Sequence, residues 1–127
     1  MPDDERCPCG SGDLFPSCCR PILDGRPAPT AERLMRSRYT AFVRGDEAHL
    51  LRSWHPSTRP RTIELDPAQR WLRLVVVDRR AGGPFDREGE VAFEAVYRDA
   101  EGRGVLRERS RFVREGRDWF YVDGVLG

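Results

Sequence analysis

Apolar residues recur at helical spacing in the first half of the chain. In the stretch "AERLMRSRYTAFVRG" they return every three or four residues, which predicts one long amphipathic helix with a single buried face. Thr30 is placed to cap the start of this helix, and Gly45 is placed to end it. Asp46 can cap a second, shorter helix that ends before Pro56, and "DPAQ" from Asp66 predicts one more helical turn. The apolar positions of the long helix are Ala31, Leu34, Met35, Tyr39, Phe42 and Val43.

From residue 71 onward the pattern changes to that of β-strands. The segments "WLRLVVVDRR", "GEVAFEAVYRD", "GVLRERSRFVRE" and "RDWFYVDG" are rich in β-branched and aromatic residues and are separated by turns that contain glycine. Four consecutive strands with short links form an antiparallel meander, and the preceding helices are available to cover its apolar face. The predicted fold class is therefore α+β, with a curved antiparallel sheet wrapped on a long helix.

The third of these strands carries polar residues on its apolar side. Strand alternation places Glu108 and Ser110 on the side that faces the interior. A buried carboxylate needs a partner, and Arg36 and Arg38 on the long helix are candidates, with Arg38 closer to the apolar stripe. One interpretation is a Glu–Arg pair that pins the helix to the sheet. The other is a pocket, in which Glu108 and His55 would be the general acid and base.

Several other residues fit either a pocket or ordinary packing. His55 follows a helix end, where it can equally cap backbone carbonyls. His49 is expected on a solvated helix face, and Asp123, which precedes a glycine, is expected in a turn. Aromatic residues on strands usually belong to a core, although they can also line a ligand site. The aromatic candidates are Trp54, Tyr97, Trp119 and Tyr121.

Composition and charge narrow the classes of function. A length of 127 residues suits one compact domain with a small appendage. The formal net charge is +1, and acidic residues are interleaved with the arginines, which does not favour a nucleic-acid binder. The chain has no apolar run of the roughly 20 residues that a membrane span needs. The acidic start "MPDDERCPCG" lacks the apolar region of a secretory signal, so we expect a cytoplasmic protein without membrane contact.

All four cysteines fall within thirteen residues, in "CPCGSGDLFPSCC". Cys7 and Cys9 come first, eight residues follow, and Cys18 and Cys19 close the segment. A reducing cytosol disfavours disulfides, and adjacent cysteines pair with difficulty. The spacing therefore predicts a metal site, with zinc as the leading interpretation and an iron–sulfur cluster as the alternative. Four protein thiolates leave no open coordination position, which indicates a structural metal rather than a catalytic one.

This segment resembles the SEC-C motif, C-P-C-G-S-G-x(5)-C-[CH], known from the tail of the SecA translocation ATPase. The resemblance implies that Cys7, Cys9, Cys18 and Cys19 bind zinc. In SecA-type tails the residues between the ligand pairs are mostly basic, and the resemblance implies that this surface docks the SecB chaperone or the ribosome. Here they are "DLFPS", without positive charge, which puts contact with SecB or the ribosome in doubt.

The rest of the chain resembles the bacterial YchJ family through "LMRSRYTAF", "WHPSTRP", "ERSRF" and "WFYVDG". That family joins an amino-terminal SEC-C motif to a cone-shaped domain of the nuclear-transport-factor-two-like, or cystatin-like, superfamily. The resemblance implies a zinc motif at residues 1–22, a linker at 23–29 and a cone at 30–127. One departure is Arg107, which stands where the family pattern has histidine. The resemblance implies an architecture and leaves the activity open.

Two hypotheses about function follow. The first is a cytosolic, non-enzymatic adaptor with a structural zinc that binds another protein. The second is a small-molecule-binding protein or enzyme that uses a pocket inside the cone. A third alternative is ribosome or RNA contact through the arginine-rich strand faces. The candidate pocket residues are Arg38, Trp54, His55, Tyr97, Glu108, Ser110 and Trp119.

Overall fold

The computed structural model describes residues 5–126 of the chain. Residues 1–4 and 127, at the outer ends of the expected domain ranges, lie outside the described residues. Helices come first and strands follow, so the predicted α+β class is confirmed. The elements are η1 (Phe15–Ser17), α1 (Cys19–Leu23), α2 (Ala31–Arg44), α3 (Glu47–Arg52), β1 (Arg70–Ala81), β2 (Glu88–Asp99), β3 (Gly102–Glu115) and β4 (Asp118–Leu126).

The long helix α2 begins and ends at the predicted residues. The Thr30 side chain accepts a hydrogen bond from the backbone N–H of Arg33 at 3.1 Å, which satisfies a free donor of the first turn. Gly45 ends the helix in the left-handed conformation, with φ of 72°. Asp46 caps α3 in the same way, through the backbone N–H of His49. No helix within residues 5–126 has both the length and the apolar character of a membrane span.

Two details of the helix prediction are wrong. Val43, expected on the buried face of α2, is 38% exposed. Asp66 starts a turn rather than a helix, because its carboxylate accepts from the backbone N–H of Ala68 and its carbonyl accepts from that of Gln69. The chain then enters β1 at once, at Arg70, and leaves no residues for a helical turn.

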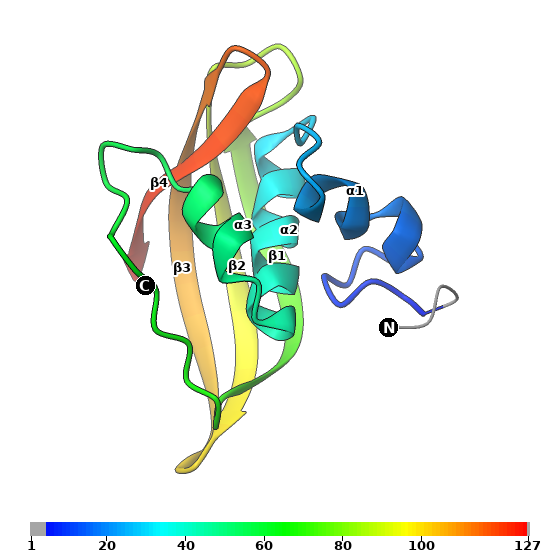
Figure 1. The fold of residues 1–127 in the computed structure, drawn as a ribbon, viewed down its shortest axis with the longest axis vertical. Helices are drawn as coiled ribbons and strands as arrows, with labels where there is room; N and C mark the ends of the chain where they lie inside the picture. Colours follow the sequence, from blue (N-terminus) through cyan, green and yellow to red (C-terminus); the bar gives the residue numbers. More distant parts are fainter. Residues whose placement is uncertain (1–4, 127) are drawn as a thin grey trace.

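The four strands form one antiparallel sheet in the order β1-β2-β3-β4. The register shifts twice along β1, after Trp71 and after Val76, and once between β3 and β4, after Arg111. Such bulges bend a strand and increase its twist. The sheet curves around α2, which lies between the sheet and the amino-terminal segment (Figure 1). The inner face of the sheet and α2 together enclose the main core.

The outer face of the sheet is charged, as the alternation along β3 predicts. Arg107 pairs with Glu94, and Arg109 pairs with Asp78. Asp123 was expected in a turn but lies in β4, where both of its carboxylate oxygens accept from Arg111 at 2.6 and 2.7 Å. Its position directly opposite Arg111 in the β3–β4 ladder explains the difference, because strand pairing overrides a local turn preference.

Candidate functional site

The four cysteines of the amino-terminal hairpin meet at one point. Their Sγ atoms all lie within 4.8 Å of one another, and all four side chains are buried. Four sulfurs bound tetrahedrally at about 2.3 Å from a zinc ion are about 3.8 Å apart. The return of the chain between the two ligand pairs uses Gly10 and Gly12, with φ of 79° and 92°. The cluster therefore has the dimensions of a four-thiolate metal site.

The electrostatics of this cluster are those of closely coupled thiols that could hold a cation. Hydrogen bonds from Cys19 and Cys7 hold the pKa of Cys9 well below its usual range. Burial raises the pKa of Cys18 to about 11, and hydrogen bonds with Cys7 and Cys9 raise the pKa of Cys19. Without a metal, the cluster thus concentrates negative charge on one sulfur and keeps protons on its neighbours. A divalent ion bound here would stabilise all four thiolates together.

Hydroxyl groups surround the sulfurs. The Thr40 hydroxyl, on α2, donates to Cys19 Sγ at 3.3 Å and lies 3.7 Å from Cys7 Sγ. The Ser11 hydroxyl lies 3.1 Å from Cys18 Sγ. Contacts of this kind orient metal ligands and stabilise their charge. Thr40 is fully buried, and its position on α2 ties the cluster to the domain.

Two arginines of α2 fix the backbone of the hairpin. Arg36 donates to the carbonyl of Cys9 at 2.7 Å, and Arg33 donates to the carbonyl of Cys18 at 3.1 Å. Glu32 orients Arg36 through an ion pair at 2.8 Å. Arg36 was a candidate partner for Glu108 but binds Glu32 and the hairpin instead. Arg33 and Thr40 were not singled out from the sequence, although all three residues fall at helical spacing on one side of α2.

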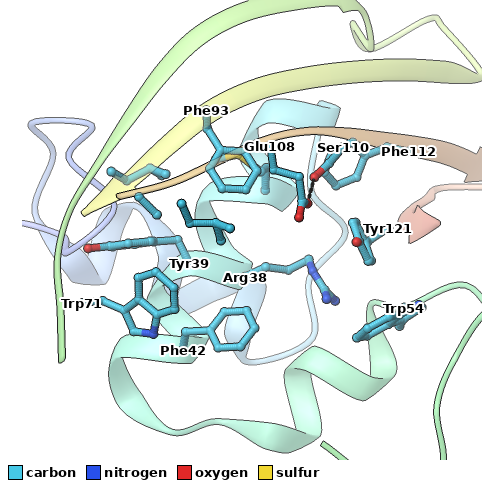
Figure 2. Close-up of a pocket in the computed structure, with 14 residues that line it drawn as sticks. Arg38, Tyr39, Phe42, Trp54, Trp71, Phe93, Glu108, Ser110, Phe112 and Tyr121 are labelled. Carbon is cyan, nitrogen blue, oxygen red and sulfur yellow. Dashed lines mark hydrogen bonds between the residues drawn. The ribbon is translucent and has the colours of Figure 1, made fainter. Parts of the chain in front are cut away.

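A second feature is a cavity of about 170 Å³ inside the cone, between α2 and the sheet (Figure 2). Its wall is mainly apolar, and three polar residues, Arg38, Glu108 and Ser110, take part in it. Small-molecule sites usually have this composition, an apolar wall with a few placed polar groups. The aromatic residues of the wall are Tyr39, Phe42, Trp54, Trp71, Phe93, Phe112 and Tyr121.

Glu108 and Ser110 lie side by side on β3, as the alternation predicts. The Ser110 hydroxyl donates to Oε2 of Glu108 at 2.5 Å. The neighbouring strand makes room for this carboxylate at Gly124, where a Cβ atom would overlap it. Figure 2 shows the carboxylate turned toward the same space as the Arg38 side chain.

Arg38 is a buried cation at the edge of the cavity. Its side chain is 7% exposed, and Nη1 donates to the carbonyl of Leu50 at 2.8 Å and to the Ser53 hydroxyl at 2.7 Å. The guanidinium carbon lies 4.5 Å from the ring centre of Tyr121 and 5.2 Å from that of Trp54. These are cation–π distances, so two aromatic rings help to stabilise the buried charge.

Arg38 is charged at neutral pH but has no ion-pair partner. Burial lowers its pKa to about 10, while the charge of Glu108 acts in the opposite direction. Within residues 5–126, no carboxylate oxygen lies within 4.0 Å of its guanidinium nitrogens. The close Glu108–Arg38 pair that one interpretation of the sequence required is therefore not formed. Both groups instead face the cavity.

The structure places four of the seven candidate pocket residues at this cavity: Arg38, Trp54, Glu108 and Ser110. His55 points away from it. Trp54 forms a parallel bridge with β4, so the next side chain along the chain faces the opposite side. The His55 ring packs at 5.7 Å from that of Phe120, and its Nε2 lies 2.8 Å from a carboxylate oxygen of Glu115.

Tyr97 and Trp119 also lie outside the cavity wall. Tyr97 packs edge-on against Trp71, with ring centres 5.6 Å apart, and does not itself reach the cavity. Trp119 faces inward from β4 but is 2% exposed and belongs to the core that includes Ile22 and Leu34. Trp119 lies two residues before Tyr121 on the same face of β4, so it packs in the core next to the cavity rather than in the cavity wall.

His49, expected in solvent, is buried between α2 and α3. It is 2% exposed, and its Nε2 lies 2.9 Å from the Ser37 hydroxyl. Ser37 donates its own proton to the carbonyl of Leu34, so His49 donates from Nε2, and Arg52 donates to Nδ1. Burial and the charge of Arg52 lower the pKa of His49 to about 4, so the ring is neutral. The prediction was wrong because α3 folds back onto α2 and covers this face.

The hairpin with its four cysteines and the curved sheet closed over α2 define a SEC-C motif joined to a nuclear-transport-factor-two-like cone. A family model described as "YchJ, middle NTF2-like domain" matches residues 30–124. The chain therefore belongs to the YchJ family, as the resemblance of its motifs indicated.

Relatives and solved structures agree with this assignment. A UPF0225 protein of Streptomyces avermitilis is 49% identical over 124 residues, which cover 97% of this chain and 86% of the relative. A UPF0225 protein of Xanthomonas oryzae pv. oryzae is 48% identical over 126 residues, which cover 97% of this chain and 95% of the relative. The solution structure of a SEC-C motif containing protein from Rhodopseudomonas palustris has a TM-score of 0.82 at 30% identity, with 94% of this chain and 96% of that chain covered. The crystal structure of a SEC-C motif containing protein from Psychrobacter arcticus has a TM-score of 0.78 at 24% identity, with 98% and 84% covered, and shows the same fold.

Proposed function

We propose that this protein binds a small, mostly apolar molecule in the cavity of the cone, and that a structural zinc ion holds its amino-terminal hairpin on α2. The observation that carries the proposal is the cavity itself. Side chains leave about 170 Å³ of the interior between α2 and the sheet unfilled, and Glu108, Ser110 and Arg38 line this space. A purely structural role for these three groups would be served better by a packed core.

The size of the cavity limits the size of its ligand. An apolar cavity of about 150 Å³ in another protein holds one benzene molecule. At about 170 Å³, this cavity suits a molecule with one six-membered ring and small substituents. The aromatic wall would contact the flat body of such a molecule, and the polar groups would set its orientation.

Binding, rather than catalysis, is the role that these side chains support. The acid–base pair suggested by the sequence needs His55 beside Glu108, and His55 faces Glu115 on the other side of β4. Glu108 is the carboxylate that lines the cavity, and its nearest hydrogen-bond partner is Ser110. A single carboxylate bound to a serine hydroxyl positions a ligand more readily than it transfers protons in two directions.

Zinc is the metal that we propose for the cysteine cluster. Four buried thiols within 4.8 Å of one another match a closed tetrahedral site, and adjacent Cys18 and Cys19 suit an iron–sulfur cluster poorly. We also propose a cytoplasmic location, because clustered thiols serve as metal ligands in a reducing compartment.

A protein-binding or adaptor role is the second candidate, and one observation favours it. Phe85, in the loop between β1 and β2, is 92% exposed. A bulky aromatic side chain of this kind is a typical anchor in protein interfaces. If Phe85 recognises a partner, Phe85→Ala will weaken that complex and leave small-molecule binding unchanged.

Native mass spectrometry and elemental analysis of the purified full chain test the proposal together. We expect one zinc per chain, and a one-to-one complex with benzene-sized compounds added in excess. The matched control is Ala95→Leu, which adds apolar volume at the cavity wall without removing a polar group. If wild type retains no more compound than Ala95→Leu does, while both bind zinc, the binding proposal is wrong.

A further inference from the structure

The unpaired charge of Arg38 points to the chemical class of the ligand. We infer that the cavity binds a small organic acid, whose carboxylate pairs with the guanidinium of Arg38 and whose ring carries a hydrogen-bond donor directed at Glu108. This inference rests on the proposed function, because it assigns a ligand class to the same cavity. Three properties of the site support it.

The first property is the unsatisfied hydrogen-bonding capacity of Arg38. A guanidinium has five N–H donors, and both hydrogen bonds that the structure shows for Arg38 leave from Nη1. Nε and Nη2 have no acceptor within residues 5–126. A buried cation without a partner is costly, and a ligand carboxylate would supply two acceptors in the geometry that guanidinium prefers.

The second property is the surroundings of that charge. Tyr121 and Trp54 lie beside the guanidinium at cation–π distance, and they stabilise it without using its N–H donors. Figure 2 shows the guanidinium directed toward the space between these two rings. Apart from Glu108 and Ser110 the remaining wall is apolar, so a ligand carboxylate beside Arg38 would be screened little by water.

The third property is the position of Glu108 in the same cavity. Its Oε2 accepts from Ser110, and its Oε1 has no donor within residues 5–126. A second carboxylate placed beside Glu108 would be repelled, so the acid group of the ligand belongs at Arg38. A hydroxyl or amine group would satisfy the free oxygen of Glu108. An aromatic hydroxy acid combines these features in a molecule of the right size.

Matched pairs of test compounds decide the ligand class on the wild-type protein. The compounds are 3- and 4-hydroxybenzoate and the corresponding hydroxybenzamides, which keep the ring and hydroxyl but lack the negative charge. Binding to the zinc-loaded full chain is followed by the NMR signals of the Trp54 and Trp71 indole N–H groups, since both rings line the cavity. We expect the tighter acid to bind at least about tenfold more strongly than its amide, because hydrogen bonds to charged groups exceed neutral ones by this amount.

Variants of Arg38 then test whether its charge is responsible for the preference for the acid. Arg38→Met is expected to abolish the preference for the acid, and Arg38→Lys to retain a weaker preference as a point charge. Because Arg38 also holds the end of α3, zinc content and circular dichroism must first show that each variant is folded. Arg107→Gln is the matched control, since it removes one positive charge from the outer face of the sheet. It should bind both compounds as wild type does.

Two outcomes overturn different statements. If the amides bind as tightly as the acids, or if folded Arg38→Met keeps the preference, the organic-acid inference is wrong and the binding cavity stands. If neither these acids and amides nor the benzene-sized compounds shift either indole signal at millimolar concentration, the proposed function fails together with the inference.

Discussion

His49 should make the stability of this protein depend on pH. The ring is buried between α2 and α3 as a neutral Nε2–H tautomer, and both nitrogens are already hydrogen-bonded. Protonation would place a second donor against Arg52, which itself donates to Nδ1. His49 therefore binds a proton less readily in the folded protein than in the unfolded chain. The substitution that tests this is His49→Gln, which keeps an N–H donor near Ser37 and cannot titrate.

The magnitude follows from the two pKa values. Burial, with the charge of Arg52, lowers the folded pKa to about 4 from an ordinary value of 6.5. Above the unfolded pKa both states are neutral and His49 contributes no pH dependence. As the pH falls from 6.5 to about 4, the unfolded state binds a proton before the folded state does, so the free energy of unfolding decreases. The loss is about 2 kcal/mol at about pH 5 and about 3 kcal/mol below about pH 4.

Urea unfolding of wild type and His49→Gln across this range measures the effect. The variant will be less stable at neutral pH by about 1 kcal/mol, because the acceptor for Arg52 changes. Its stability will then fall less than that of wild type on acidification, and the two curves will converge or cross. Zinc release at low pH affects both proteins and cancels in the difference. His55→Gln reports any contribution of the other histidine. Parallel curves for wild type and His49→Gln would refute the reasoning.

Three further predictions concern other parts of the structure. Thr40→Val removes the hydroxyl that donates to the cysteine cluster, and zinc affinity measured by chelator competition should fall by about tenfold or more; an unchanged affinity would show that the contact is incidental. Gly124→Ala places a Cβ atom against the Glu108 carboxylate, and urea unfolding should show a loss of about 1–3 kcal/mol. A variant as stable as wild type would mean that the carboxylate moves freely. Arg111→Gln breaks an exposed pair with Asp123, and the urea midpoint should stay within experimental error.

Local signals predicted the secondary structure well. The ends of α2 depend on the hydroxyl of Thr30 and the backbone freedom of Gly45, and both act on the nearest turn of the chain. The cysteine spacing is likewise a local property, and it predicted a compact ligand cluster. Alternation along β3 correctly directed Glu108 and Ser110 inward.

Features that depend on packing between distant segments could not be predicted in this way. His49 is buried rather than solvated because α3 folds onto α2, and His55 faces Glu115 rather than the cavity because the bridge to β4 turns it away from the cone. The cavity depends on the curvature of the sheet, which comes from bulges that periodicity does not reveal. Arg33 and Thr40 lie on a second face of α2. Their role became clear only from the position of the hairpin, which both residues contact.

A crystal structure of the zinc-loaded protein soaked with 4-hydroxybenzoate tests the central claim most directly. The account predicts one molecule inside the cone, with its carboxylate within hydrogen-bonding distance of Arg38 and its hydroxyl at Glu108. A structure in which the wall closes on itself around Phe93 and Trp71, and in which the compound is absent from the cone, would contradict the claim that this protein holds a binding cavity.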